Sequence, residues 1–192
     1  WEGNGFTSVR VLDVIHLEID PSARSFDDHA ATLKYKYRYQ LSRYRNALDP
    51  ERYETVTLTD FLPYLDELYP LYLDVSRRAS EYTAPPYPAA YFHIVKHHFG
   101  DDAVITAIRR RDNGRFLGFM LVLYAKESCV HQYIGFDRID ELYLWYNLTV
   151  GAIDEAIRRR VFRINMGVTH AVSKHKFGAH SEATSMLVKS IR

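Results

Sequence analysis

The sequence has little cysteine, no long apolar run and almost no net charge. Cys129 is the only cysteine, so an intramolecular disulfide is excluded. No uninterrupted apolar stretch is long enough to cross a bilayer. Lys and Arg number 25 against 24 Asp and Glu, which gives no general attraction to nucleic acid. We therefore expect a protein of a reducing, cytoplasmic compartment that does not span a membrane.

Several catalytic and metal-binding signatures are also missing. The sequence has no GxxxxGK[ST] phosphate-binding loop, no dinucleotide-binding GxGxxG and no GxSxG nucleophile turn. Kinase, dehydrogenase and hydrolase functions are therefore disfavoured. His97 and His98 are adjacent, so they project from a helix in different directions and do not suit joint metal ligation. Cys129 lies in an apolar strand, where a buried inert thiol is expected. We expect no metal site.

The amino-acid composition suits one folded domain. Hydrophobic residues make up 47% and aromatic residues 14% of the 192 positions, enough for a continuous core. Short apolar and β-branched runs predict strands at 9–17, 53–58, 103–110, 116–124, 129–136, 161–166 and 182–191. Apolar residues at helical spacing predict helices over 26–48, over about twenty residues from Thr59 or Asp60, over 89–99 and after Asp140. A proline-rich loop is expected over 82–88.

The order of these elements indicates the fold class. Asn113-Gly114 separates two strand patterns and predicts a tight antiparallel hairpin. The helix after Asp140 forms a crossover, so the strand at 161–166 should lie parallel to the strand at 129–136. We predict an α/β (α+β) fold with a mixed, mostly antiparallel sheet flanked by helices. The parallel strand pair should splay around a ligand crevice.

The first candidate site lies at a junction between a strand and a helix. Gly135-Phe136-Asp137 leads to a helix that starts near Leu142 and Tyr143. Free backbone N–H groups at such a helix start, together with the helix dipole, can hold a phosphate or carboxylate. The alternative is an ordinary turn in which Asp137 or Asp140 caps the helix.

The second candidate site follows the strand at 161–166. Gly167 permits a close approach of the backbone, and His170, Lys174, His175 and Lys176 gather hydrogen-bond donors within a few residues. Such donors suit an anionic ligand. The alternative is a solvated basic loop anchored by Phe177 in the core.

The third candidate is a basic and aromatic stripe on the helix predicted over 26–48. Lys34, Arg38 and Arg45 share one face, and Tyr35 and Tyr39 are four residues apart. Interleaved basic and aromatic residues can hold phosphates and stack on bases, so an RNA partner fits this stripe. Such a stripe is more often the solvated face of an amphipathic helix, and the near-zero net charge counts against RNA.

Several short motifs follow one another from about residue 25 to the end of the chain. They are Leu33-Lys34-Tyr35-Lys36-Tyr37-Arg38, Arg77-Arg78, Gly118-Phe119, Tyr133-Ile134-Gly135-Phe136-Asp137, Leu142-Tyr143-Leu144-Trp145-Tyr146, Ile164-Asn165-Met166-Gly167 and Lys174-His175-Lys176-Phe177-Gly178. Each motif is short, but their order and spacing resemble a GNAT domain of the FemABX-like and BioF2-like acyltransferases, the relatives of peptidoglycan-bridge enzymes. The K-x-x-F-G pattern is the most specific part of the resemblance.

The resemblance implies a single GNAT-like domain over residues 1–192, with a strand and turn over 1–24 ahead of the family motifs. The chain does not begin with Met, so we expect a piece of a longer protein. The implied reaction is transfer of an acyl or aminoacyl group to an amine, either a small molecule or a cell-wall precursor. The donor is acyl-CoA in most GNAT enzymes and aminoacyl-tRNA in the peptidoglycan-bridge branch. A partner GNAT half-domain or a homodimer fits the same resemblance.

The chemistry of such a transfer defines the candidate residues. It needs a positioned uncharged amine, a donor for the developing oxyanion and a path for the amine proton. The catalytic candidates, which the sequence does not rank, are His131, Tyr133, Asp137 and His170. The candidates for binding the donor are Gly135, Phe136, Asp137, Leu142, Tyr143, Gly167, Lys174 and Lys176. The usual pyrophosphate signature, Q/R-x-x-G-x-G/A, is missing, so a non-catalytic GNAT-like module that binds a phosphate-bearing ligand or supports a partner domain is the alternative.

Overall fold

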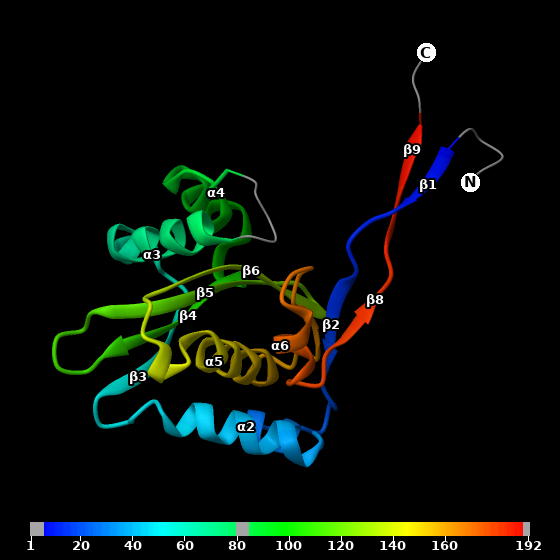
Figure 1. Ribbon diagram of the computed structural model, residues 1–192. Helices are drawn as coiled ribbons and strands as arrows, with labels where there is room; N and C mark the ends of the chain where they lie inside the picture. Colours follow the sequence, from blue (N-terminus) through cyan, green and yellow to red (C-terminus); the bar gives the residue numbers. More distant parts are fainter. Residues whose placement is uncertain (1–5, 80–84, 190–192) are drawn as a thin grey trace.

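The protein forms one seven-stranded sheet with helices on both faces and a separate two-stranded ribbon, as the computed structural model in Figure 1 shows. The structure describes residues 6–79 and 85–189. The strands of the main sheet lie in the order β3 (Tyr53–Leu58), β4 (Ala103–Arg110), β5 (Phe116–Tyr124), β6 (Ser128–Phe136), β7 (Arg163–Asn165), β2 (Val14–Glu18) and β8 (His180–Glu182). The ribbon consists of β1 (Phe6–Arg10) and β9 (Ser185–Lys189).

The direction of the strands confirms the predicted topology. β5 pairs with β6 in antiparallel orientation, and β6 pairs with β7 in parallel orientation. The other paired strands are antiparallel. The hairpin at Asn113-Gly114 is also confirmed, because the flanking strands β4 and β5 pair in antiparallel orientation. Within the turn, Gly114 adopts a φ of +72° and the Arg115 N–H donates to Asn113 Oδ1 at 3.0 Å. The predicted class, a mostly antiparallel mixed sheet flanked by helices, is therefore correct.

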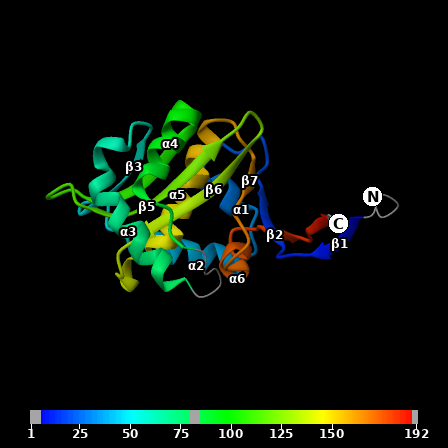
Figure 2. The same ribbon diagram turned by 90° about the horizontal axis from the view of Figure 1, so that it is seen from above.

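Helices cover the two faces of the sheet, as Figures 1 and 2 show. α3 (Leu65–Arg78) and α4 (Ala89–Phe99) lie on one face. The other face carries α5 (Leu144–Arg158), against which α1 (Phe26–Ala31) and α2 (Tyr35–Asn46) pack. The short α6 (Ala171–His175) follows β7, and 3₁₀ turns cover Leu62–Tyr64, Gly100–Asp102 and Asp140–Leu142. In the described part of the chain, no helix is long and apolar enough to cross a membrane.

A core lies on each face of the sheet, and the sequence of β4 explains why. Val104 and Ile108 pack into the core under α5, while Ile105 and Ala107 pack into the core under α3 and α4. Because successive residues of a strand point to opposite faces, a strand buried on both faces carries a nearly continuous apolar run, as β4 does from Ala103 to Ile108 apart from Thr106. The central part of the sheet is therefore held from both sides and provides a rigid frame for the strands beside it.

The prediction of a single strand over 9–17 is wrong. The structure breaks it into β1 and β2 around residues 11–13. The two pieces have different partners, since β1 pairs with β9 in the ribbon while β2 lies between β7 and β8 in the main sheet. The strand predicted over 182–191 divides in the same way into β8 and β9, and residues 190–191 lie outside the described residues.

The helix predicted over 26–48 is also interrupted. α1 ends at Ala31 and α2 begins at Tyr35. Thr32 Oγ1 donates to the carbonyl of His29 at 2.8 Å, and Leu33 approaches Gly178, so the break places Leu33 against another segment. Ser25 caps α1 with a complete capping box.

Two other predicted boundaries are shifted. Neither Thr59 nor Asp60 caps a helix, because a 3₁₀ turn precedes α3 and its N-cap is Tyr64. The strand predicted over 161–166 is reduced to residues 163–165 in β7. The helix over 89–99 has the predicted bounds. Of the loop predicted over 82–88, residues 85–88 form neither helix nor strand, and residues 82–84 lie outside the described residues.

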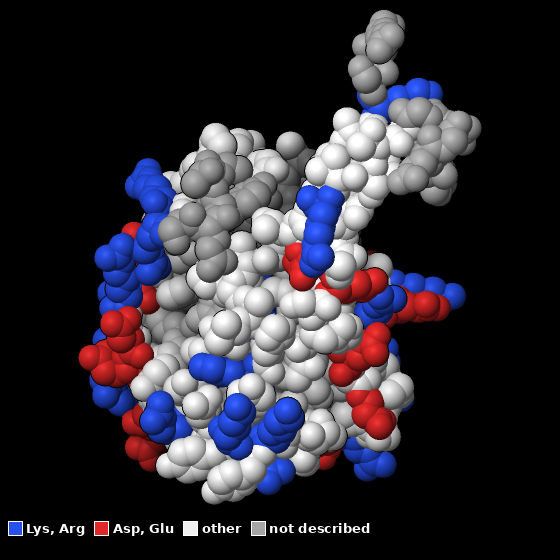
Figure 3. Space-filling model, turned by 45° about the vertical axis from the view of Figure 1, so that its right-hand side comes forward, with Lys and Arg blue, Asp and Glu red and all other residues white. Residues whose placement is uncertain are grey.

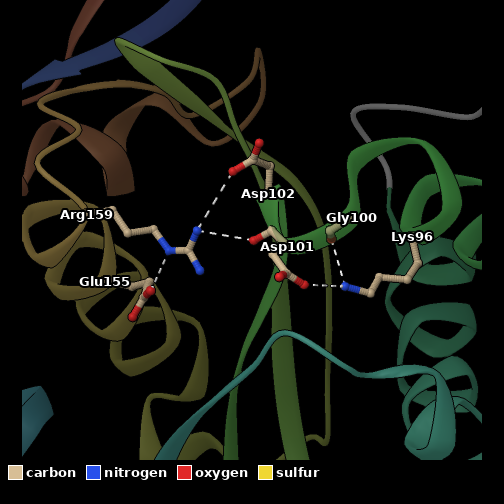
Figure 4. A network of polar contacts seen from close by, with 6 residues as sticks. All are labelled: Lys96, Gly100, Asp101, Asp102, Glu155 and Arg159. Atoms are coloured by element: carbon tan, nitrogen blue, oxygen red, sulfur yellow. Dashed lines mark hydrogen bonds and ion pairs between the residues drawn. The ribbon is translucent and has the colours of Figure 1, made fainter.

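A polar network ties the end of α5 to the start of β4 (Figure 4). Glu155 is buried, with a side chain only 4% exposed, and accepts from Arg159 Nε at 2.7 Å. Arg159 Nη1 also donates to the Asp101 carbonyl at 3.2 Å. Lys96 of α4 contacts the Asp101 carboxylate at 3.2 Å, so one network links helices from both faces of the sheet. Arg158 and Thr57 are further partners of Glu155.

Loss of the Glu155 charge should destabilise the fold. We expect Glu155→Gln to lower the free energy of unfolding by about 1–3 kcal/mol, since it weakens charged hydrogen bonds to a buried group. Urea denaturation monitored by circular dichroism measures this change. The control Glu141→Gln, at an exposed position, should stay within about 0.5 kcal/mol of the parent. A Glu155→Gln variant as stable as this control would contradict a stabilising role for the network.

Candidate active site

A cavity opens where β6 and β7 separate. The two strands are paired only through Ser128, Cys129 and Val130 of β6, opposite Arg163 to Asn165 of β7. Beyond this short ladder the strands diverge, and a cavity of about 410 Å³ lies beside the separated ends. Its walls are Tyr72, Val75, Ser76, Ala79, Pro85, Tyr87, Met120, His131, Gln132, Tyr133, Ile134, Trp145, Met166, Gly167, Val168, Thr169, His170 and Lys174. Its position corresponds to the crevice that the topology predicted.

A β-bulge in β6 shapes one wall of the cavity. Leu121 of β5 lies opposite Tyr133, but the next residue, Val122, lies opposite His131, so Gln132 is the extra residue. Side chains of a regular strand alternate between faces, and a bulge disturbs this alternation and re-aims side chains. The four consecutive residues around the bulge, from His131 to Ile134, all line the cavity.

The segment after β7 supplies the cationic part of the cavity. Gly167 adopts a φ of +79°, a conformation that favours glycine, and its N–H donates to Asn165 Oδ1 at 2.8 Å. A Cβ at Gly167 would lie 3.8 Å from Lys174 Nζ, so the ammonium group is next to this backbone turn. Lys174 is only 6% exposed. The chain therefore holds a buried cation at the wall of the cavity.

His131 lies near this cation. The residue as a whole is half-buried because part of it faces the cavity, while its Nε2 is enclosed and lacks a hydrogen-bond partner in the described part of the protein. Burial, followed by the positive charge of Lys174, lowers the pKa of His131 from 6.5 to about 3. His131 is therefore neutral near pH 7 and a weak proton acceptor.

The opposite wall is aromatic. Tyr72 of α3 meets Tyr133 of β6 edge to face at 5.4 Å between ring centroids, and Tyr87 lies 5.7 Å from Tyr133. The Tyr87 N–H donates to Tyr72 Oη at 3.0 Å, which anchors the segment before α4 to α3. Burial raises the pKa of the Tyr133 phenol above its ordinary value. The phenol therefore keeps its proton and can donate a hydrogen bond into the cavity.

The structure brings some of the predicted site residues together in this cavity. His131, Tyr133 and His170 among the catalytic candidates are wall residues, as are Gly167 and Lys174 among the binding candidates. His170 is the N-cap of α6 and has a φ of +55°. The clustering of segments from β6 and from the chain after β7 agrees with the predicted topology. The roles of these residues in catalysis stay predictions.

The other predicted residues lie outside the cavity wall. Asp137 forms an ion pair with Arg115 at 2.8 Å. The Phe136 carbonyl accepts from Arg78 Nη2 at 2.9 Å, and Lys176 Nζ donates to Tyr146 Oη at 2.9 Å. Leu142 is buried in the core under α5. These contacts give each residue a packing or pairing partner, and their roles toward a ligand stay predictions.

Gly135 and Tyr143 have specific backbone roles outside the cavity. A Cβ at Gly135 would lie 2.4 Å from the backbone nitrogen of Tyr72, so glycine allows α3 to approach β6 closely. Tyr143 has a φ of +46° at the N-cap of α5, and its ring lies 4.3 Å from that of Tyr44. The start of α5 still borders the cavity, because Trp145 in its first turn is a wall residue.

Four cavity residues were not predicted from the sequence, namely Tyr72, Tyr87, Gln132 and Trp145. Tyr72 follows an apolar helical pattern that indicates core, and no local signal places a cavity beside it. Gln132 is the extra residue of the bulge, whose position depends on the register with β5. Trp145 occurs in a motif that sequence analysis singled out, so its position near the helix start was the available signal. In the described segments, no group of three or more His, Cys, Asp or Glu could hold a metal ion.

His131 should make the fold sensitive to mild acid. Because its pKa is about 3 in the folded protein against an ordinary 6.5, the unfolded chain takes up more protons between these pH values. The free energy of unfolding should fall as the pH drops from 6.5 toward 3, by up to about 1.4 kcal/mol per pH unit from this group. His131→Gln should reduce this slope, measured by urea denaturation between pH 7 and pH 5.

Two other histidines define how this result is interpreted. His29 is buried and its pKa is also lowered by burial, so it should retain part of the acid sensitivity in the His131→Gln variant. His93 is exposed, and the control His93→Gln should keep the full slope of the parent protein. Equal slopes in the His131→Gln and His93→Gln variants would contradict a buried, neutral His131.

Comparison with known proteins agrees with this fold. Residues 32–176 match the family described as "Acetyltransferase (GNAT) domain". No protein of curated function matches the sequence. The match covers well over half of the chain, so the chain belongs to the GNAT acetyltransferase domain family. The GNAT resemblance of its motifs is therefore confirmed.

Three solved structures show the same fold. The C-terminal domain of an Agrobacterium fabrum protein named as a lysylphosphatidylglycerol synthetase has a TM-score of 0.64 at 11% identity, over 98% of this chain and 63% of that chain. A FemX structure has a TM-score of 0.65 at 11% identity, over 94% of this chain and 64% of that chain. A tandem GNAT protein from the clavulanic acid biosynthesis pathway has a TM-score of 0.55 at 13% identity, over 97% and 55%. This chain thus spans less than two thirds of each of these proteins.

Proposed function

We propose that this domain transfers an acyl or aminoacyl group from a donor in the β6–β7 cavity to the nitrogen of an amine. The observation that carries the proposal is the divergence of the parallel strands after Val130, with a cavity bordered by His131, Gly167 and the buried Lys174. Acyl-CoA is the first candidate donor. The acceptor is a small-molecule amine, or the amine of a cell-wall precursor as the FemABX resemblance implies.

The separated strands provide a binding site for an extended donor. From His131 onward, β6 leaves its ladder with β7, so the backbone of this strand edge is available to a ligand placed between the strands. An extended chain with amide groups can pair with such an edge as an added strand would. The apolar side chains of Met120, Ile134 and Met166 line the same space. An amide-containing arm that ends in a thioester fits this combination of backbone and apolar wall.

The reaction forms a C–N bond and breaks the bond between the acyl carbon and its carrier. The amine must lose a proton, and the departing thiolate or alkoxide must gain one. We assign Tyr133, which keeps its proton, as hydrogen-bond donor to the leaving group. We assign to Lys174 the stabilisation of the negative charge that develops on the donor. His131, with a pKa near 3, is a weak base, so we assign it to positioning and assign proton removal to His170 or to water.

Aminoacyl-tRNA is the second candidate donor, and the surface of α2 favours it. α2 contains no acidic residue, and Tyr35 and Tyr39 are 73% and 60% exposed with stacked rings 6.4 Å apart. The Arg38 guanidinium lies 5.8 Å from the Tyr35 ring centroid. Figure 3 shows separate Lys and Arg side chains on the lower part of the molecule, where α2 lies, with Asp and Glu toward the edges. Exposed tyrosines between cations can stack on bases and hold phosphates.

A transfer assay with both donors tests the proposal. Purified protein is mixed with acetyl-CoA or longer acyl-CoAs and a panel of amines, and released thiol and acylated amine are measured together. Parallel reactions contain aminoacyl-tRNA and the same amines. Acylated amine above the level without protein, from either donor, supports transfer. Saturable binding of both donors without any product would instead identify the non-catalytic module. The absence of both binding and product would refute the assignment of the cavity as the donor site.

The α2 surface allows the two donors to be separated. We expect the double variant Tyr35→Ala/Tyr39→Ala to weaken tRNA binding by about 10-fold or more, since each stacked base contributes about 1–3 kcal/mol. Binding of acyl-CoA in the cavity should not change. Filter binding for tRNA and calorimetry for acyl-CoA provide the two measurements. Unchanged tRNA binding in the double variant would remove the observation that favours the tRNA donor.

A further inference from the structure

A cluster of two cations and three tyrosines lies on the face of the sheet that carries α5. Its members are Arg43, Tyr44, Tyr143, Tyr146 and Lys176. They come from α2, from the start of α5 and from the residue after α6, which are segments far apart in the chain. We call this group the tyrosine–cation cluster. Its residues are not among those that line the β6–β7 cavity.

Aromatic rings hold both cations of the cluster. The Arg43 guanidinium lies 5.4 Å from the centroid of the Tyr44 ring, and Lys176 Nζ lies 5.6 Å from the same centroid. Tyr44 is buried, and its ring centroid lies 4.3 Å from those of Tyr143 and Tyr146. A cation within about 6 Å of an aromatic ring is attracted to its face. Two like charges are therefore held around one ring, which makes this part of the surface electropositive.

The hydrogen-bond donors of the cluster are only partly used. Lys176 Nζ donates to Tyr146 Oη at 2.9 Å, which occupies one of the three N–H groups of the ammonium. Tyr146 Oη donates in turn to Ser173 Oγ at 3.3 Å, so the hydrogen of the Ser173 hydroxyl can point to another acceptor. Within the described ranges, neither Arg43 nor Lys176 forms an ion pair with a carboxylate. A negatively charged group with several acceptor oxygens complements these donors.

The cluster borders the cavity. Tyr146 follows the wall residue Trp145, and the two ring centroids lie 5.0 Å apart. Ser173 precedes the wall residue Lys174. An extended ligand whose reactive end lies beside Lys174 can therefore pass Trp145 and reach the cluster. Arg43 extends the electropositive surface onto α2, and Figure 3 shows further Lys and Arg side chains on the side of the molecule where α2 lies.

We propose that the tyrosine–cation cluster binds a phosphate group of the donor, at the end of the donor that stays outside the cavity. The inference rests on the proposed placement of the reactive end of the donor in the β6–β7 cavity. Both candidate donors share this chemistry, because acyl-CoA carries a pyrophosphate and aminoacyl-tRNA carries phosphodiesters next to its acylated end. Lys176 and Ser173 donate to phosphate oxygens, and Arg43 adds a planar fork of N–H donors. The cluster thus replaces the Q/R-x-x-G-x-G/A signature that the sequence lacks.

Calorimetric titration of the 192-residue chain with CoA and with pantetheine tests the coenzyme as the source of the phosphate. Pantetheine has the same thiol arm but no phosphate, so the parent protein should bind CoA at least about 10-fold more tightly. Lys176→Met should weaken CoA binding by about 10-fold or more, as expected for the loss of a charged hydrogen bond. Arg43→Met should weaken it by about 2- to 5-fold, because Arg43 is exposed. Pantetheine binding should stay at the parental level in both variants.

A matched control and a second substitution separate phosphate binding from folding. Lys126→Met removes an exposed cation in the turn before β6, whereas the cluster lies beyond the other end of that strand, so binding of both ligands should not change. Circular dichroism establishes that the variants keep the fold. If Lys176→Met unfolds the chain, Lys176→Gln provides the same comparison, because glutamine removes the charge and keeps a donor for Tyr146.

Filter binding of uncharged tRNA over a range of salt concentrations tests the second source of phosphate. Each phosphate contact that is lost should reduce the slope of log affinity against log salt concentration by about 0.7–0.9. A reduced slope in Lys176→Met with parental CoA affinity assigns the phosphate to tRNA. A weaker affinity for CoA with a parental slope for tRNA assigns it to the coenzyme.

Three results would overturn the phosphate site. They are parental affinity of the Lys176 and Arg43 variants for both CoA and tRNA, an equal loss of CoA and pantetheine binding, and a parent protein that binds neither CoA nor tRNA. Failure of the proposed function has a different outcome. A parent protein with the expected phosphate dependence of binding that forms no acylated amine would refute the transfer reaction and leave the phosphate site in place.

Discussion

Replacement of Lys174 by methionine is expected to lower kcat/KM for acyl transfer by about 10- to 150-fold while the protein stays folded. This range corresponds to about 1.5–3 kcal/mol, the contribution expected from a hydrogen bond to a charged group. Methionine keeps most of the length of the side chain and its apolar stem, so the cavity wall is preserved while the ammonium group is removed. Steady-state kinetics and calorimetric titration with the donor measure the loss.

The position of Lys174 explains why the effect should be large. It is buried beside Gly167 and close enough to His131 to lower the pKa of that imidazole. Interactions with a charge are stronger in such a partly dry site than at the surface. The control Lys126→Met removes an exposed charge in the turn between β5 and β6 and should leave kinetics unchanged.

Two results would contradict the assignment of Lys174. A variant that binds and reacts as well as the parent would show that the ammonium group does not contact the donor. A variant that unfolds would show that Lys174 mainly stabilises the structure. Lys174→Arg distinguishes these cases further, because it keeps the charge but changes its shape and reach.

Replacement of Gly135 by alanine should cause the largest loss of stability among the predicted variants at glycine positions. A Cβ there would lie 2.4 Å from the backbone nitrogen of Tyr72 and 2.6 Å from the backbone carbonyl carbon of Leu71. These atoms belong to α3, so the helix itself must move. Overpacking of this kind costs about 1–3 kcal/mol. Thermal and urea denaturation measure the effect.

The same variant separates two roles for Gly135. If Gly135 serves only the close approach of α3 to β6, Gly135→Ala should lower stability first and donor binding only as Tyr72 shifts. Loss of donor binding at parental stability would instead support the ligand-binding role that the strand-to-helix motif predicted. The control Gly114→Asn changes a glycine with open space and a φ of +72°, which asparagine tolerates, so its stability should hardly change.

Local sequence signals correctly predicted the elements whose bounds are set by residues within the element itself. The helix over 89–99 has its predicted bounds because its apolar spacing and Gly100, with a φ of +54° at the C-cap, are features of the segment itself. The Asn113-Gly114 hairpin was correct for the same reason. The prediction of one helix over 26–48 was wrong, because the break at Thr32 depends on contacts of His29 and Leu33 with residues 177 and 178.

Part of the candidate site was accessible from the sequence because topology constrains it. A helical crossover between parallel strands places the end of β6 near the segment after β7, which brings His131 and Tyr133 to the same cavity as Gly167 and Lys174. The course of the chain around that cavity was not accessible. Asp137 and Lys176 are close in sequence to wall residues, but contacts with Arg115 and Tyr146 hold them elsewhere.

The sequence by itself determined the order of the elements, the parallel pair and the cationic segment from Gly167 to Lys174, because periodicity, turn residues and crossover handedness act over short stretches of chain. Only the tertiary structure decided which side chains face the cavity. The bulge at Gln132 arises from the register between β5 and β6, and the aromatic wall arises from the approach of α3 to Gly135. Both depend on packing between segments far apart in the chain, which no local pattern records.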